Sequence, residues 1–106
     1  MREVTATLEL TPEQEAELFR QLGGEADWDE QRENIARRLI ESRLRLVVAI
    51  AEKHSSSRKL SMLERIEEGN LGLMHAIRSY ALNPRGDFVA FANACIENAI
   101  IAAEKH

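Results

Sequence analysis

The sequence predicts an all-α fold, a compact bundle of one short and three long helices. In the three long segments, apolar residues recur at intervals of three and four, which is the spacing of one helix face. Capping residues precede two of the four expected helices. Only five Gly and two Pro occur in 106 residues, which argues against a turn-rich sandwich or barrel. With 44% apolar and 30% charged residues, the chain has enough apolar side chain for one core.

The amino-terminal residues 2–10 differ from the rest because apolar and polar side chains alternate along them. The apolar residues, which would share one side of an extended strand, are Val4, Ala6, Leu8 and Leu10. A lone strand has no partner in a helical domain, so its backbone groups stay unpaired. This arm is therefore disordered, lies along the body of the domain, or pairs with a second copy in a homodimer through residues 2–10.

A short acidic helix follows the arm. Thr11 is suited to the N-cap, Pro12 to the first helical position, and Gln14 completes a capping box. The helix should end at Gly23 and Gly24. We therefore divide the chain into residues 1–24, the arm with its short helix, and residues 25–106, a helical domain.

Three long helices are expected in residues 25–106. The first runs without interruption from about Asp29 to the polar residues 55–59, with Ile35, Leu39, Leu46 and Ile50 on one stripe. The second begins with the capping box of Ser61 and Glu64 and ends at residues 83–86. The last starts at about Asp87, and its apolar stripe is Phe88, Phe91, Ala92, Cys95, Ile96, Ala99 and Ala103.

Two features of the helix that begins near Ser61 have more than one explanation. Gly69 and Gly72 are unfavourable in a helix interior, so either another backbone packs closely there or a partner docks there. Glu64, Glu67 and Glu68 form one acidic patch, which is either a solvated face or a binding face.

Signals of catalysis and of metal binding are missing. No Gly-rich loop joins a strand to a helix, as a phosphate site would require. The three histidines (His54, His75 and His106) have no ligand spacing, and Cys95 lies on an apolar stripe, as inert core cysteines do. We expect no enzymatic activity, no metal and no cofactor.

Charge and hydropathy restrict the partners and the location. The net charge is −4, but residues 1–29 carry two basic and eight acidic side chains, whereas residues 30–59 carry eight basic and four acidic ones. Any contact with nucleic acid must therefore be local. The longest apolar run, residues 46–51, is too short to cross a bilayer. A single Cys suits a reducing compartment, and we expect a cytoplasmic protein.

Two sequence blocks carry a resemblance to a known family. Residues 44–51 (LRLVVAIA) and 64–77 (ERIEEGNLGLMHAI) resemble the second conserved region of bacterial RNA polymerase sigma factors. The Pro84-Arg85-Gly86 turn and the helix after it continue the pattern, so that the resemblance covers about residues 35–103. It implies a helical domain that docks on a coiled coil of the polymerase's largest subunit and that reads and melts the promoter −10 element. The implied polymerase-binding residues are Glu64, Glu67, Glu68, Asn70 and Met74.

The resemblance implies DNA contacts at Arg85, Phe88, Phe91 and Asn98, but this part of the pattern is altered. The family's adjacent Trp pair falls on Ala94 and Cys95, and its Arg falls on Glu97. Loss of two stacking rings and reversal of a charge near phosphate both weaken DNA binding. We therefore expect promoter melting by this chain alone to be weak or absent.

Three functions are compatible with the sequence. The first is a sigma-factor-like initiation module that binds RNA polymerase core and contacts the −10 element. The second is a sigma mimic or regulatory adaptor that binds polymerase or an anti-sigma protein without reading DNA. The third is a helical oligomerisation domain that retains only the fold.

Overall fold

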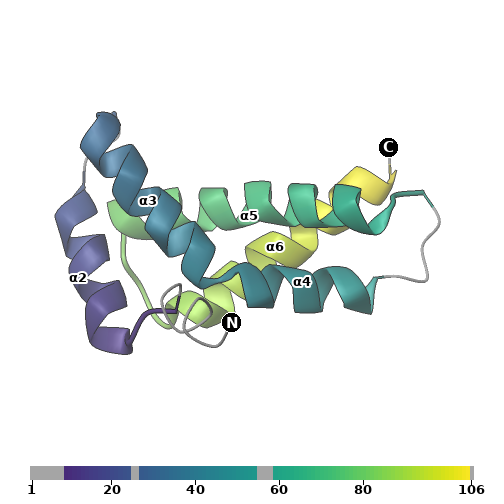
Figure 1. Cartoon of the computed structure of the whole chain (residues 1–106), viewed down its shortest axis with the longest axis horizontal. Helices are drawn as coiled ribbons and strands as arrows, with labels where there is room; N and C mark the ends of the chain where they lie inside the picture. The colour runs from purple at the N-terminus through teal and green to yellow at the C-terminus, as the bar shows by residue number, and fades with distance from the viewer. Residues whose placement is uncertain (1–8, 25–26, 55–58, 106) are drawn as a thin grey trace.

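The computed structural model describes residues 9–24, 27–54 and 59–105, and these contain five α-helices and no strand (Figure 1). The helices are α2 (Pro12–Leu22), α3 (Glu30–Ser42), α4 (Leu44–Lys53), α5 (Met62–Leu82) and α6 (Phe88–Lys105). The all-α prediction is confirmed. The alternating segment lies outside the described residues except for Glu9 and Leu10, and so does most of the polar run at 55–59.

The predicted helix starts are confirmed at two capping boxes. Thr11 Oγ1 accepts from the Gln14 amide at 3.1 Å, and the Gln14 side chain accepts from the Thr11 amide at 2.9 Å. Ser61 and Glu64 form the same reciprocal pair at 3.1 and 2.8 Å. Each box satisfies two amides that the first turn leaves without a partner. The end of α2 is also as predicted, because Gly23 has a φ of +60°, which favours glycine.

The prediction of one continuous helix from Asp29 is wrong at Arg43, which separates α3 from α4. Arg43 has φ −116° and ψ 16°, outside helical values. Its guanidinium donates to both carboxylate oxygens of Glu15 on α2, at 2.9 and 3.0 Å. The Ser42 hydroxyl also bonds the Leu39 carbonyl at 2.7 Å, in competition with the helix. Contacts distant in sequence stabilise this break, and no Gly or Pro marks it.

Helix α5 packs against both α4 and α6, and its two glycines allow the close approach. A Cβ at Gly72 would lie 2.6 Å from the Cys95 carbonyl oxygen, and one at Gly69 would lie 2.8 Å from Val47 Cγ1. The glycines therefore face the interior. Close packing of α5 on α4 and α6, rather than a docked partner, explains why glycine occupies both positions. The largest side chains that are fully buried are Leu22, Leu39, Val47, Leu73, Ile77, Ile96 and Ile100.

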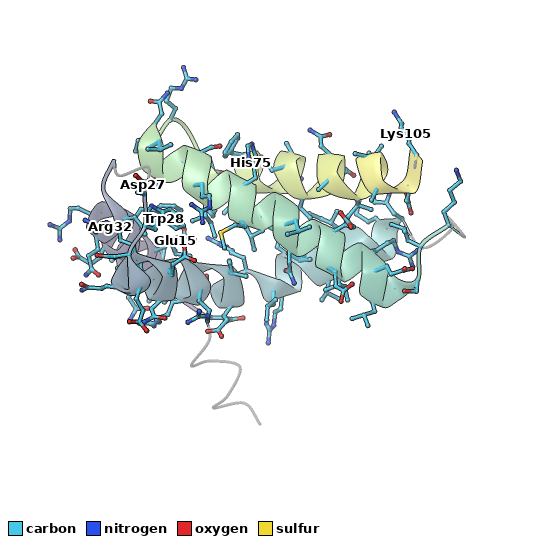
Figure 2. All side chains as sticks on the ribbon, turned by 90° about the horizontal axis from the view of Figure 1, so that it is seen from above. Glu15, Asp27, Trp28, Arg32, His75 and Lys105 are labelled. Atoms are coloured by element: carbon cyan, nitrogen blue, oxygen red, sulfur yellow. The ribbon has the colours of Figure 1, made fainter. Side chains whose placement is uncertain are left out.

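Helix α2 is fixed to the end of the molecule formed by α3 and the α5–α6 turn. Phe19 packs edge-to-face on Tyr80 and Phe88, with ring centroids 4.9 and 4.8 Å away. Arg32 Nε donates to the Leu22 carbonyl at 3.3 Å, which caps α2. Figure 2 shows Arg32 at this end of the molecule and Lys105 at the opposite end. Helix α2 thus shares the core of the other four helices.

Candidate functional site

The five residues implied in polymerase binding lie on the amino-terminal two thirds of α5, away from its buried glycine side. Glu64 and Glu67 are exposed, and Glu68, Asn70 and Met74 are half-buried. Because Gly69 and Gly72 face the core, α5 cannot rotate without disturbing the packing, and its opposite side stays turned to solvent. We name these five residues together with Leu63 and Leu71 the α5 face.

Leu63 and Leu71 are the residues of the α5 face that the sequence analysis missed. Their side chains are 66% and 64% exposed, and they lie one helical turn before and one turn after Glu67. Large apolar side chains exposed beside charges are typical of protein-binding surfaces. Both leucines fall outside the apolar stripe of Ile66, Leu73 and Ile77. This offset was the feature of the sequence that could have predicted their exposure.

Glu64 has a structural role in addition to its place on the α5 face. It accepts from the Ser61 amide, and hydrogen bonds with the Ser61 backbone and side chain lower the pKa of its carboxyl. The carboxyl therefore stays ionised to lower pH than that of an ordinary Glu. Asn70 Oδ1 is buried and has no hydrogen-bond partner among the described residues.

Arg65, where sigma factors usually have Leu, does not belong to the α5 face. Its side chain is 5% exposed, and its guanidinium donates to the Leu60 carbonyl at 2.7 Å and lies 3.7 Å from the Met62 sulfur. The aliphatic stem of Arg can replace Leu in packing while its head group bonds to backbone. This departure from the family pattern therefore leaves the outward surface of α5 unchanged.

The four residues implied in DNA binding are only partly brought together. Arg85 and Phe91 border one shallow hollow with Leu82, of about 400 Å³, and Phe91 is 37% exposed. Asn98 is exposed two turns further along α6. Phe88 is 5% exposed and packs on Phe19 and Tyr80, so its ring has no open side for a base.

Glu97, at the position where the resemblance implies an Arg, interacts with two residues at the C-terminal end of α4. Its carboxylate lies 3.2 Å from His54 Nε2 and 4.0 Å from Lys53 Nζ. The pairing joins residues 43 positions apart, which no sequence pattern indicated. Ala94 is exposed where the family has a ring, and burial raises the pKa of the Cys95 thiol beside it, which makes that thiol a poorer nucleophile.

Metal binding and membrane insertion find no support in the described ranges. No three His, Cys, Asp or Glu side chains there are grouped so that they could hold a metal ion. None of the described helices has both the length and the apolar character needed to cross a bilayer.

Comparison with known protein families assigns the chain to one of them. Residues 39–103, more than half of its length, match the model of the family described as Sigma-70 region 2. The chain belongs to the sigma-70 region 2 family. The matched residues run from the end of α3 to the last turn of α6 and include the α5 face and the altered α6 surface. This region 2 domain is therefore a transcription-factor domain, and the family associates it with RNA polymerase core. Helix α2 lies outside the match.

Proposed function

We propose that this region 2 domain binds RNA polymerase core through the α5 face, on the coiled coil of the largest subunit. The observation that carries the proposal is the combination of exposed carboxylates and two exposed leucines on a helix fixed by close packing. The leucines supply apolar area, and the carboxylates supply charge complementarity and orientation toward a basic partner. In this proposal residues 25–106 form the docking domain and residues 1–24 form an accessory arm and helix.

The test is capture of polymerase core by the full chain and by the Glu68→Lys variant. Reversal of this charge should reduce capture at least about tenfold, since close charge pairs across interfaces contribute more than about 1.4 kcal/mol. Glu52→Lys, an exposed reversal on α4 outside the α5 face, is the matched control and should retain capture. Equal capture by both variants, with unchanged helical circular dichroism, would remove the α5 face from the proposal.

The adaptor function is the second candidate, and the α6 surface favours it. Ala94 and Cys95 offer no ring, and Glu97 holds a negative charge where phosphate would approach. Polymerase captured by this chain without opening of a promoter duplex supports the adaptor. Opening of a −10 duplex, with Phe91 and Arg85 required, supports the initiation module. An anti-sigma protein that competes with polymerase for the α5 face would extend either function.

A further inference from the structure

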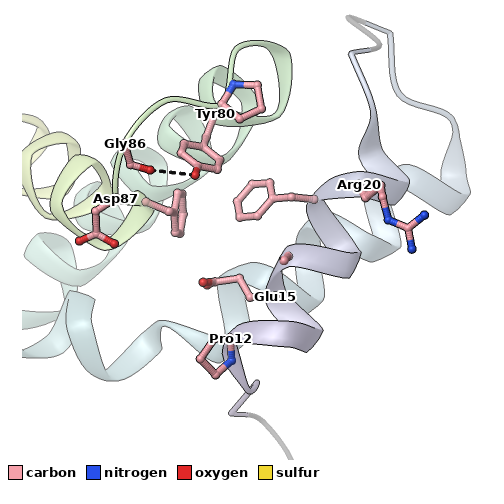
Figure 3. A pocket seen from close by; sticks show the side chains of 10 residues that line it. Pro12, Glu15, Arg20, Tyr80, Gly86 and Asp87 are labelled. Atoms are coloured by element: carbon pink, nitrogen blue, oxygen red, sulfur yellow. Dashed lines mark hydrogen bonds between the residues drawn. The ribbon is translucent and has the colours of Figure 1, made fainter.

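A pocket of about 490 Å³ lies between α2 and the turn that joins α5 to α6, apart from the α5 face (Figure 3). None of its lining residues belongs to the α5 face, and all of its α2 residues lie outside the family match. Its volume is in the range of pockets that bind small ligands or single side chains of a partner.

The pocket has an aromatic wall. Phe19, Tyr80 and Phe88 pack edge-to-face, with centroids 4.8 to 5.2 Å apart. The Tyr80 hydroxyl donates to the Gly86 carbonyl at 3.0 Å, which fixes the ring against the turn (Figure 3). Tyr80 is half-buried, and its ring is the most accessible of the three. Aromatic rings fixed in this way attract cations to their faces.

Two carboxylates, those of Asp87 and Glu15, border the pocket together with one guanidinium, that of Arg20. Asp87 uses Oδ2 to accept from the Ala90 amide at 3.2 Å, which leaves Oδ1 available. Glu15 accepts from Arg43, but a carboxylate has about four acceptor positions and can take another donor. Figure 3 shows the Glu15 side chain directed from α2 toward the turn, whereas the Arg20 guanidinium points away from the rings and pairs with Glu17.

The surroundings of the pocket are acidic. Its lining holds the carboxylates of Glu15 and Asp87 and one guanidinium, that of Arg20, which pairs with Glu17. Such a field attracts cationic groups and repels phosphate. The pocket is therefore poorly suited to a nucleotide and well suited to a cation.

We propose that this pocket binds an Arg or Lys side chain from a basic segment of a second protein. The cation would lie against Tyr80 and donate to Asp87 and Glu15. The molecule already contains a similar arrangement, because the Arg78 guanidinium lies 4.1 Å from the centre of the Trp28 ring and donates to Glu33 at 3.3 Å. The proposal is independent of polymerase binding by the α5 face.

The test is a titration of the isotope-labelled full chain with the capped peptide Gly-Arg-Leu-Arg-Gly, followed by amide chemical shifts. The amides of Tyr80, Gly86 and Asp87 should move, and the peptide with Glu in place of Arg should leave them unchanged. Asp87→Asn should weaken binding by about threefold, the size of an exposed ion pair. Asn is also a good N-cap, so this variant keeps the start of α6.

Glu13→Gln is the matched control, because it removes one charge from α2 outside the pocket. It should leave the affinity within about twofold of the unaltered chain. Equal weakening by Glu13→Gln and Asp87→Asn, shifts confined to the α5 face, or stronger shifts of the same amides by single-stranded DNA would each overturn the proposal.

Discussion

Substitution of Gly72 by Ala tests the packing that holds the α5 face in position. The added Cβ would lie 2.6 Å from the Cys95 carbonyl oxygen, 2.9 Å from Ala99 Cβ and 3.0 Å from Ile96 Cα. Two of these atoms belong to the α6 backbone and cannot rotate away, so α5 and α6 must separate. Overpacking of this kind costs about 3 kcal/mol at the upper end of its usual range, and Ala recovers about 1 kcal/mol of helix propensity. The expected net loss in the free energy of unfolding is about 2 kcal/mol.

Gly69→Ala is the matched substitution on the same helix. Its Cβ would meet only side-chain atoms, Val47 Cγ1 at 2.8 Å and the Ile96 and Ile100 methyls at 3.2 and 3.4 Å. These can shift by a few tenths of an ångström, although Val47 is β-branched and stiff. The propensity gain should therefore offset most of the cost, and the net change should be within about 1 kcal/mol of zero.

Urea unfolding of both variants, followed by far-ultraviolet circular dichroism, measures these differences. The expected order of stability places Gly72→Ala well below Gly69→Ala, with unchanged slopes. Gly24→Ala is a neutral reference, because nothing lies within 4 Å of its added Cβ. A Gly72→Ala variant as stable as the unaltered chain would refute the close approach of α5 to α6.

Three further predictions concern other parts of the chain. The lowered pKa of Glu64 means that its contribution to stability is complete above the ordinary value of 4.5 and is lost as the pH falls through its folded pKa. Glu64→Gln should abolish this acid dependence, measured by amide exchange at the start of α5. If the dependence persists in the variant, another group causes it. Ala94→Trp with Glu97→Arg should raise the affinity for a −10-type single strand at least about tenfold, through stacking and removal of repulsion; an unchanged affinity in a fluorescence titration would show that α6 does not meet DNA. The chain beginning at Thr11 should sediment as a monomer and the full chain as a dimer if residues 2–10 pair between copies; identical sedimentation of both would end that hypothesis.

Local signals in the sequence were sufficient for most of the helix boundaries. The capping boxes at Thr11 and Ser61, the glycine after α2 and the turn at residues 83–86 each act within a few residues, so their effect can be read without the fold. The buried stripe of α5 followed from its period for the same reason. The cost of Gly69 and Gly72 in a helix interior left close packing and a docked partner both open, and the structure decides for close packing.

Features that depend on distant contacts could not be predicted. The break at Arg43 depends on Glu15, 28 residues away, and Glu97 meets His54 across 43 residues. Burial of Phe88 depends on α2, which supplies Phe19. A helical period places Phe88 and Phe91 on neighbouring sides of α6, but only the packed structure shows which of them remains exposed.

The α5 face and the outer surface of α6 can change independently, because different residues connect each of them to the same hydrophobic core. The α5 face depends on the spacing set by Gly72 against the α6 backbone at Cys95, whereas Ala94 is exposed and Glu97 pairs with α4. Exposed positions away from the core change stability by only about 0.5 kcal/mol, and distant sites act independently. Replacement of exposed side chains on α6 is therefore expected to leave the geometry of α5 intact. Under the proposed function, such changes on α6 weaken promoter contact and leave the proposed polymerase-docking surface on α5 unaltered.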